Sequence, residues 1–185
     1  SPHWPQLTEL QLNNNPFGDA GLKALANSPH FPNLTTLHIL HTKIGPDGLR
    51  ALVSSPHFPK LATLTSSTQG DAGLQAMASA SRLPALTSLQ LLYNKITDAG
   101  LEALAASTNM SQLTHLNLGG SKITDEGLIA LAASPNLPNL THLNLPMSNI
   151  TNTGLTALAN SPHFHNLKIY QGAFTDHPND ILSSP

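Results

Sequence analysis

The chain has no cysteine among its 185 residues, so its own residues supply no disulfide framework, thiolate metal site or cysteine nucleophile. Charged side chains make up only 10% of the sequence, the net charge is −2, and lysine and arginine never form a run. A protein that binds nucleic-acid phosphates needs a basic face, so we expect no nucleic-acid partner. No apolar run approaches about 18 residues, so we predict no membrane-spanning segment.

The motifs of common catalytic sites are also missing. There is no His-Glu-x-x-His zinc pattern, no Gly-x-Ser-x-Gly nucleophile turn and no glycine-rich phosphate loop. Four aspartates instead share one place in a repeated pattern, where negative charge suits the start of a helix: Asp19, Asp71, Asp98 and Asp125. We therefore predict a protein that is not an enzyme and that needs no cofactor.

What the sequence does contain is one pattern repeated about every 27 residues, the mark of a stacked repeat protein. Each unit opens with a leucine in a Leu-x-x-Leu-x-Leu string. The six clear openers are Leu7, Leu34, Leu61, Leu86, Leu113 and Leu140, and Leu167 opens a degenerate seventh unit. The third unit is shortened after its leucine string and carries Ser66 where other units carry leucine or isoleucine, so we expect a local dent there.

The fifth unit shows the structure expected of each repeat. Leu116 and Leu118 alternate with polar residues, which is the two-residue period of a strand with one buried face. Thr124 is a good helix N-cap, and Ser134-Pro135 ends the helix because proline disfavours helical geometry at the residue before it. Parallel strands joined through helices cross over right-handed, so the units predict a right-handed stack of strand, turn, helix and return loop.

These units resemble the leucine-rich-repeat family. The strings Leu113-Thr-His-Leu-Asn-Leu118 and Ile123-Thr-Asp-Glu-Gly-Leu128 carry the resemblance, and the fourth and sixth units copy them. They are similar to the long ribonuclease-inhibitor type and the cysteine-containing type of F-box substrate receptors, in a style typical of bacterial arrays. The resemblance implies an α/β solenoid, a horseshoe with a parallel sheet on the concave face and short helices on the convex face. It implies one domain, 1–185, in which 167–185 form a degenerate or capping repeat.

Two further positions repeat in every unit and predict scaffold roles. A glycine recurs in the first helical turn, where it costs roughly 1 kcal/mol relative to alanine, so we expect a close approach of helix and sheet. These glycines are Gly21, Gly48, Gly73, Gly100, Gly127 and Gly154. The return loops carry apolar residues that we expect to fill the core: Phe31, Phe58, Leu83, Met110, Leu137 and Phe164.

The surface that the repeats leave free is the candidate binding site. If the leucines point inward, the side chains at the third, fifth and seventh positions of each unit point outward on the sheet. His115 and His142 share the third position of adjacent units and should lie roughly 5 Å apart. Two histidines are fewer ligands than a metal site needs, so we predict none. The predicted partner-binding residues are Leu40, His41, Leu92, Tyr93, His115, His142 and Met147.

Together these patterns predict a non-enzymatic module that binds a protein through the concave sheet and its adjoining loops. Three alternatives remain open. One is the substrate-recognition part of a ubiquitin-ligase-like protein, and another is part of a bacterial effector. The third is a structural spacer that associates end to end through the open ends of the solenoid. A cytoplasmic location is favoured, with a secreted effector as the alternative. The alternative explanation of the exposed leucines is that single apolar residues are common on protein surfaces and have no binding role.

Overall fold

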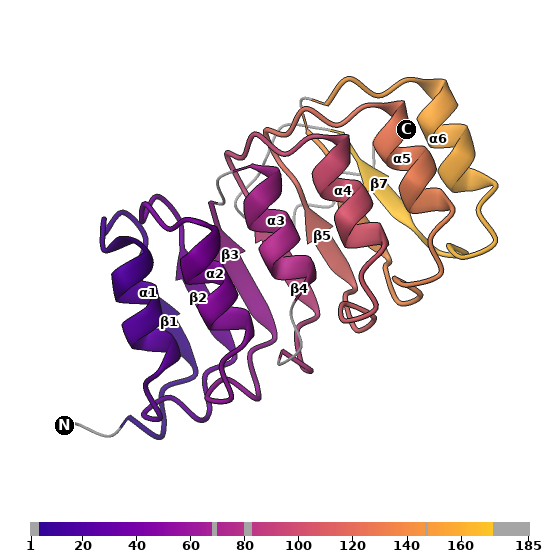
Figure 1. Cartoon of the computed structure of the whole chain (residues 1–185). Coiled ribbons are helices and arrows are strands. Elements are labelled where there is room, and N and C mark those ends of the chain that lie inside the picture. The colour runs from indigo at the N-terminus through magenta and orange to yellow at the C-terminus, as the bar shows by residue number, and fades with distance from the viewer. Residues whose placement is uncertain (1–3, 68–69, 80–82, 147, 172–185) are drawn as a thin grey trace.

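The computed structural model describes residues 4–67, 70–79, 83–146 and 148–171, and these form one parallel sheet covered by helices (Figure 1). The strands are β1 (Glu9–Gln11), β2 (Thr36–Ile39), β3 (Thr63–Ser66), β4 (Ser88–Leu91), β5 (His115–Asn117), β6 (His142–Asn144) and β7 (Lys168–Tyr170). The helices are α1 (Gly18–Ala26), α2 (Pro46–Val53), α3 (Asp71–Ala78), α4 (Asp98–Ala105), α5 (Asp125–Ala132) and α6 (Asn152–Ala159). Strand order in the sheet follows chain order, which confirms the predicted solenoid.

The helices form one layer on one face of the sheet, and none of the described helices covers the other face, which we call the open face (Figure 1). Neighbouring strands lie about 4.8 Å apart, whereas packed helices need about 8–10 Å. The spacing between repeats is therefore larger in the helix layer than in the sheet. Where the stack curves, the sheet lies on the concave side. Among the described residues, every helix is too short and too polar to cross a lipid bilayer.

Leucines at equivalent positions line up between the layers to form one continuous core. Leu89, Leu116 and Leu143 are paired across β4, β5 and β6 and are buried, as predicted. Burying one leucine contributes roughly 1.5–3 kcal/mol, so the aligned leucines are a large source of stability. The return loops close this core as expected, with Phe31 half-buried and the others buried: Phe58, Leu83, Met110, Leu137 and Phe164.

The seventh strand departs from the predicted register by one residue. In β7, Lys168 lies opposite His142 and Ile169 lies opposite Leu143. The expectation that Leu167 opens the seventh unit is therefore wrong, because Leu167 lies one position further along the ladder than the leucines of the other units. A register shift of one residue moves every side chain of a strand to the other face of the sheet. In the observed register, Ile169 occupies the core position that leucine holds in the neighbouring unit. The rest of the predicted terminal repeat, 172–185, lies outside the described residues.

The third unit keeps its strand in register despite its shortened sequence. Ser66 lies opposite Ile39 and Leu91, as a leucine would, and it is fully buried. The hydroxyls of Ser66 and Thr65 have no hydrogen-bond partner among the residues that the structure describes. A buried hydroxyl without a partner costs about 1–3 kcal/mol, so this unit is a weak place in the stack. The dent or change in curvature expected at Ser66 stays a prediction, and residues 68–69, which follow this strand, are outside the described part.

Four units fix the start of the next helix through an aspartate. Asp98, in α4, accepts hydrogen bonds from the Thr124 N–H (2.8 Å), the Thr124 hydroxyl (2.7 Å) and the Gly127 N–H (3.1 Å). Thr124 is the N-cap of α5, so a carboxylate of one unit satisfies the orphan donors of the next. We call this series the aspartate ladder. Its other members are Asp19 with Gly45 and Gly48, Asp71 with Thr97, and Asp125 with Thr151 and Gly154.

Donation from Thr151 and Gly154 has an electrostatic consequence at Asp125. The Thr151 hydroxyl, and then the Thr151 and Gly154 amides, lower the pKa of Asp125 below its ordinary 3.8, because they stabilise the charged carboxylate. The aspartates were expected to act as dipole partners of their own helices. The structure adds that they bind the neighbouring unit, which the sequence pattern did not reveal.

The aspartate ladder also explains most of the repeated glycines. A Cβ added to Gly127 would lie 2.5 Å from Asp98 Oδ1, and one added to Gly154 would lie 2.6 Å from Asp125 Oδ1. Only glycine lets the carboxylate approach the amide. The predicted steric reason is therefore confirmed, but the expected neighbour was wrong, because it is the preceding helix and not the sheet. In the first unit, the Phe17 side chain occupies the corresponding space beside Gly21.

One rung of the aspartate ladder is missing. The second unit carries Pro46 at the ladder position, and proline has no carboxylate to reach the third unit. The Gly73 N–H donates instead to the carbonyl of Gly70 in its own unit, at 3.2 Å. The junction between the second and third units therefore lacks the carboxylate contact and keeps strand pairing, apolar packing and a hydrogen bond from the His41 N–H to the Ser67 hydroxyl at 2.9 Å.

We predict that Asp98→Ala lowers the free energy of unfolding by about 2–3 kcal/mol, since it leaves three donors of the next helix without their acceptor. Asp47→Ala is the matched control. Asp47 also lies in a first helical turn but contacts only Arg50 of its own helix, at 3.2 Å, and is exposed. Its loss should cost under about 1 kcal/mol. Urea unfolding measures both, and equal losses would contradict a stabilising role of the ladder.

Candidate functional site

The open face of the sheet carries the side chains at the third and fifth positions of each unit. The third positions are Glu9, Thr36, Thr63, Ser88, His115, His142 and Lys168. The fifth positions are Gln11, His38, Thr65, Gln90, Asn117, Asn144 and Tyr170. The charged members lie at opposite ends, with Glu9 3.7 Å from His38 in the first units and Lys168 on β7. The middle of this face is polar and uncharged.

Three aromatic rings stack at the C-terminal end of this face. The rings of His115 and His142 are nearly parallel, at 6°, with centroids 4.2 Å apart. Tyr170 continues the row, parallel to His142 at 4° with a centroid distance of 6.1 Å. The predicted proximity of the two histidines is therefore confirmed. We call His115, His142 and Tyr170 the ring stack.

Hydrogen bonds to the preceding threonines hold both histidine rings. The Thr114 hydroxyl has a single proton and lies 3.0 Å from the Thr87 carbonyl oxygen and 2.8 Å from His115 Nδ1. The Thr87 carbonyl also accepts the backbone N–H groups of Thr114 and His115, so the hydroxyl is equally placed to donate to His115 Nδ1. Thr141 makes the same pair of contacts, with the Thr114 carbonyl (3.2 Å) and His142 Nδ1 (2.9 Å). Each histidine ring is therefore held by the threonine hydroxyl that precedes it, whichever ring nitrogen carries the proton.

The surroundings also favour the neutral form of these rings. Burial lowers the pKa of His115 below 6.5. Burial, and then the positive charges of His115 and Lys168, lower the pKa of His142. Near neutral pH, the open face therefore presents two neutral imidazole rings side by side and not two positive charges.

A second exposed aromatic feature lies in the turns after the strands. Tyr93 is 68% exposed, and its ring lies 5.2 Å from that of His41 across the sheet. Both residues have left-handed backbone, with φ of 57° and 53°, a conformation that is unfavourable for most side chains. The same register position is left-handed at Asn14 and Gly120. The backbone of the repeat thus directs this side chain outward whatever its identity.

The predicted partner-binding residues do not all reach solvent. Tyr93, His41 and His115 are exposed, and Leu40 and His142 are half-buried. Leu92 is only 4% exposed, so its expected place on an exposed apolar edge is wrong. It is buried outside the main core, and a Cβ at Gly119 would touch both Leu92 and Pro146. The seventh position therefore packs along the sheet instead of facing outward. Met147 lies outside the described residues.

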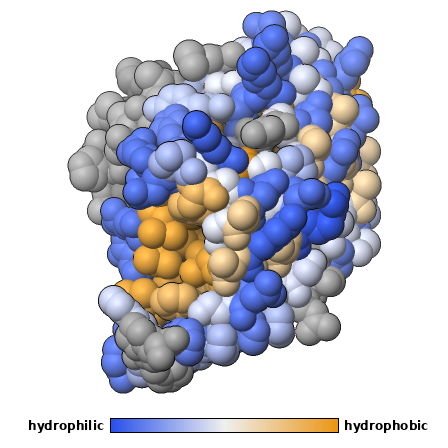
Figure 2. All heavy atoms as spheres, turned by 60° about the vertical axis from the view of Figure 1, so that its left-hand side comes forward, coloured by the Kyte–Doolittle hydropathy of each residue, from blue (hydrophilic) through white to orange (hydrophobic). Residues whose placement is uncertain are grey.

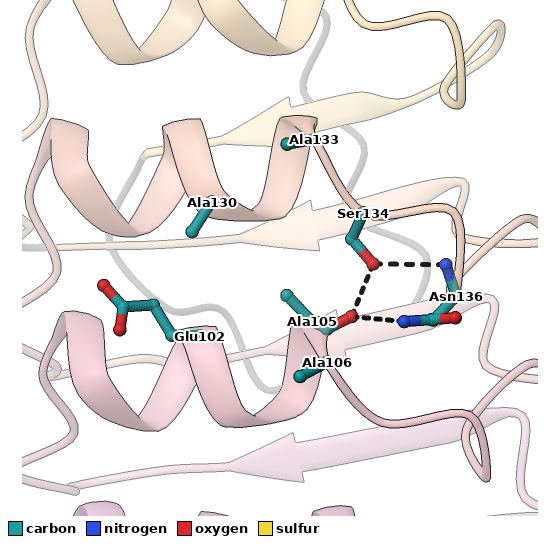
Figure 3. A pocket seen from close by; sticks show the side chains of 7 residues that line it. All are labelled: Glu102, Ala105, Ala106, Ala130, Ala133, Ser134 and Asn136. Atoms are coloured by element: carbon teal, nitrogen blue, oxygen red, sulfur yellow. Dashed lines mark hydrogen bonds between the residues drawn. The ribbon is translucent and has the colours of Figure 1, made fainter.

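The helix side has one shallow hollow, of about 220 Å³, between α4 and α5 (Figure 3). Alanines form its floor, and Ser134 and Asn136 lie at its edge. Both donate to the Ala105 carbonyl, from the Ser134 hydroxyl and, at 2.9 Å, from the Asn136 side-chain amide. Because this carbonyl ends the preceding helix, these polar groups hold one unit to the next. Glu102 also lines the hollow and is the charged side chain among its lining residues.

The described residues contain no group of three or more His, Asp, Glu or Cys side chains arranged around a common point. A closed metal site of four protein ligands is therefore not formed by this part of the chain.

The chain belongs to the leucine-rich repeat family. The family's sequence model, described as Leucine Rich repeat, matches residues 5–26, 30–53, 83–105, 109–132 and 136–159, more than half of the chain. The shortened third unit is left unmatched. Leucine-rich repeats generally mediate protein–protein interaction, and members of the family are typically not enzymes.

Comparisons with whole proteins and solved structures give no specific function for the chain. No curated protein matches the chain. Among solved structures, the chain is similar to an internalin of Listeria monocytogenes, at 19% sequence identity and a TM-score of 0.41. The match covers 92% of this chain and 62% of the internalin chain, so this chain corresponds to less than two thirds of that protein.

We predict that the two neutral histidines make stability depend on pH. Their folded pKa values lie below the ordinary 6.5, so the unfolded chain takes up protons first as the pH falls. Their contribution to the free energy of unfolding is complete above about pH 6.5 and is lost as the pH falls through the folded pKa values. Urea unfolding between about pH 8 and pH 5 should show this loss. The loss should shrink in the His115→Asn, His142→Asn double variant and persist in the return-loop control His57→Asn.

Proposed function

We propose that the chain is a non-enzymatic protein-binding module whose docking surface is the open face of the sheet with the turns that follow the strands. The observation that carries this proposal is the exposed Tyr93 ring beside His41. Exposed aromatic side chains bordered by polar groups are enriched among the residues that dominate binding energy in protein interfaces.

Two properties of the open face support a protein ligand. Rings lie at two places on it, the Tyr93–His41 pair and the ring stack, so a partner meets rigid apolar surface at both. Between them, side chains such as Gln90 and Asn117 offer uncharged donors and acceptors. Such a mixture suits a polypeptide, which presents both backbone amides and apolar side chains. The same binding role fits a ubiquitin-ligase-like receptor or a bacterial effector.

The test is selection of peptides displayed on phage against the whole chain, followed by affinity measurements on variants. We expect selected peptides to bind Tyr93→Gly and His115→Asn at least about tenfold more weakly, a loss of about 1.4 kcal/mol. Glycine is the suitable replacement at Tyr93 because the backbone there is left-handed, so the ring is removed without adding strain.

Ile129→Ser provides the matched control for the peptide selection. Ile129 is 46% exposed on α5, on the helix side of the molecule, and its removal also deletes an exposed apolar side chain. We expect unchanged affinity in this variant. Peptides that depend on Ile129 and tolerate both open-face variants would contradict the proposal and place docking on the helices.

A second candidate function, end-to-end association of copies, is favoured by the N-terminal end of the stack. Figure 2 shows apolar side chains gathered on the end of the molecule that comes forward in that view. The half-buried apolar residues of the first unit are Leu7, Leu10, Leu12, Phe17 and Leu25. Within the described sheet, β1 pairs only with β2, so its outer edge offers backbone groups to another strand.

Sedimentation velocity over a range of concentrations tests this second candidate. If copies associate through the N-terminal end, the mean sedimentation coefficient rises with concentration, because an open head-to-tail contact does not close. A single monomeric species at all concentrations, up to about 100 µM, would rule out a spacer that depends on self-association alone.

A further inference from the structure

The turns that follow the strands carry a row of lysines. They occupy the tenth position of the second, fourth and fifth units: Lys43, Lys95 and Lys122. All three side chains are exposed. Since neighbouring strands are about 4.8 Å apart, the three steps from the second unit to the fifth place the ends of the row about 14 Å apart. We call these residues the lysine row.

The lysine row lies beside the Tyr93–His41 pair. Lys43 follows His41 by two residues, and Lys95 follows Tyr93 by two residues. The residue between them in each turn is buried, so the side chains on either side of it extend from the turn into solvent. Aromatic and cationic side chains therefore share one edge of the open face.

The two rings of the pair meet above the third unit. His41 belongs to the second unit and Tyr93 to the fourth, so their strands are two spacings, or about 9.6 Å, apart. The ring centroids are 5.2 Å apart, which bridges much of this distance over the shortened third unit. Along the stack, the pair therefore lies between the turn of Lys43 and the turn of Lys95.

The lysine row has no counter-charge of its own. Its ammonium groups make no ion pair with the residues that the structure describes. The sequence places neither Asp nor Glu in any turn between a strand and the following helix. Glu9, on the open face, lies in the first unit and is 3.7 Å from His38. This edge is therefore a positive strip.

The acids of the helix starts, which follow the turns, are held by other groups. Asp98 and Asp125 accept hydrogen bonds from the start of the next helix, where the helix dipole offsets negative charge. Asp47 pairs with Arg50 at 3.2 Å. Glu126 is exposed in the first turn of α5, in the helix layer. The lysine row therefore remains available to a partner.

The scaffold does not require lysine at this position. The first and sixth units carry Pro16 and Asn149 there. Lys95 and Lys122 occupy the same position of adjacent units, and like charges placed side by side on neighbouring strands are destabilising. A bound segment of opposite charge removes this repulsion. The row is therefore better explained by recognition than by stability of the stack.

We propose that the docking partner contributes an acidic polypeptide segment that lies along this edge. Its Asp or Glu side chains pair with the lysine row, and a large apolar side chain packs on the Tyr93–His41 pair. Because the pair lies between Lys43 and Lys95, acidic residues flank the apolar one on both sides. An extended chain advances about 3.3 Å per residue, so about five residues span the row. This inference rests on the proposed function and adds the chemistry of the partner.

Peptides selected on phage against the whole chain test the acidic partner. We expect enrichment of Asp and Glu around an aromatic residue or leucine. The same selection against the triple variant Lys43→Gln, Lys95→Gln, Lys122→Gln should lose this enrichment. Synthetic copies of the selected peptides should bind the triple variant at least about tenfold more weakly in about 50 mM NaCl. Circular dichroism establishes that each variant is folded.

Salt dependence gives a second measurement on the same peptides. Raising NaCl from about 50 mM to about 500 mM should weaken binding to the unchanged chain by about fivefold or more, because salt screens exposed charges. The triple variant should change by less than about twofold over the same range. Lys23→Gln is the matched control, because Lys23 is an exposed lysine on α1, in the helix layer. It should bind as the unchanged chain does.

The outcomes separate this inference from the proposed function. Neutral or basic peptides that lose affinity in Tyr93→Gly would overturn the acidic partner and leave protein binding by the open face standing. Acidic peptides that bind the triple variant and the unchanged chain equally would do the same. A single-stranded oligothymidine that binds through the lysine row, where no acidic peptide binds, would also overturn it. Failure to select any peptide that depends on the open face would overturn both proposals.

Discussion

A carboxylate of one unit holds the start of the next unit's helix, and the regularity of this structure depends on that contact. Neighbouring units satisfy polar groups at each other's helix ends. The donors at the start of α5 are completed by Asp98 of α4, and the carbonyl at the end of α4 is completed by Ser134 of the following loop. A helix of eight residues is marginal in isolation, so each one is stable only between its neighbours. The glycines allow the contact, and the leucine core supplies the larger stabilising free energy.

The fold was predictable because the same sequence pattern recurs from unit to unit. The alternation of Leu116 and Leu118 predicted a strand with one buried face, and equal spacing predicted that Leu89, Leu116 and Leu143 align. Prediction failed where a single unit departs from the pattern. At Leu167 the leucine suggested one register, and the pairing of Ile169 with Leu143 shows another. The partner of the repeated glycines was also not predictable, because spacing along the chain does not show which neighbouring element supplies the contact.

The candidate site was predictable in its register and not in its details. Sharing a register position was enough to place His115 beside His142. The position of both rings depends on the threonines before them, whose hydroxyls contact the rings and the carbonyls of the preceding strand. Two-residue alternation alone predicts that the Leu92 side chain points to solvent, and this prediction was wrong. After the strand ends, the backbone turns toward the left-handed Tyr93, and two-residue alternation no longer applies. Two-residue alternation predicts side-chain direction only within the strand itself.

The proline at the place of an aspartate has a consequence for how such a stack comes apart. In a linear array, each unit contacts only its nearest neighbours. The boundary with the weakest interface energy therefore limits the cooperativity of unfolding. Pro46 removes a carboxylate contact at one boundary, and the buried hydroxyls of Thr65 and Ser66 weaken the unit that follows. Under tension or heating, the array should open there first, so that two short blocks separate before either one melts.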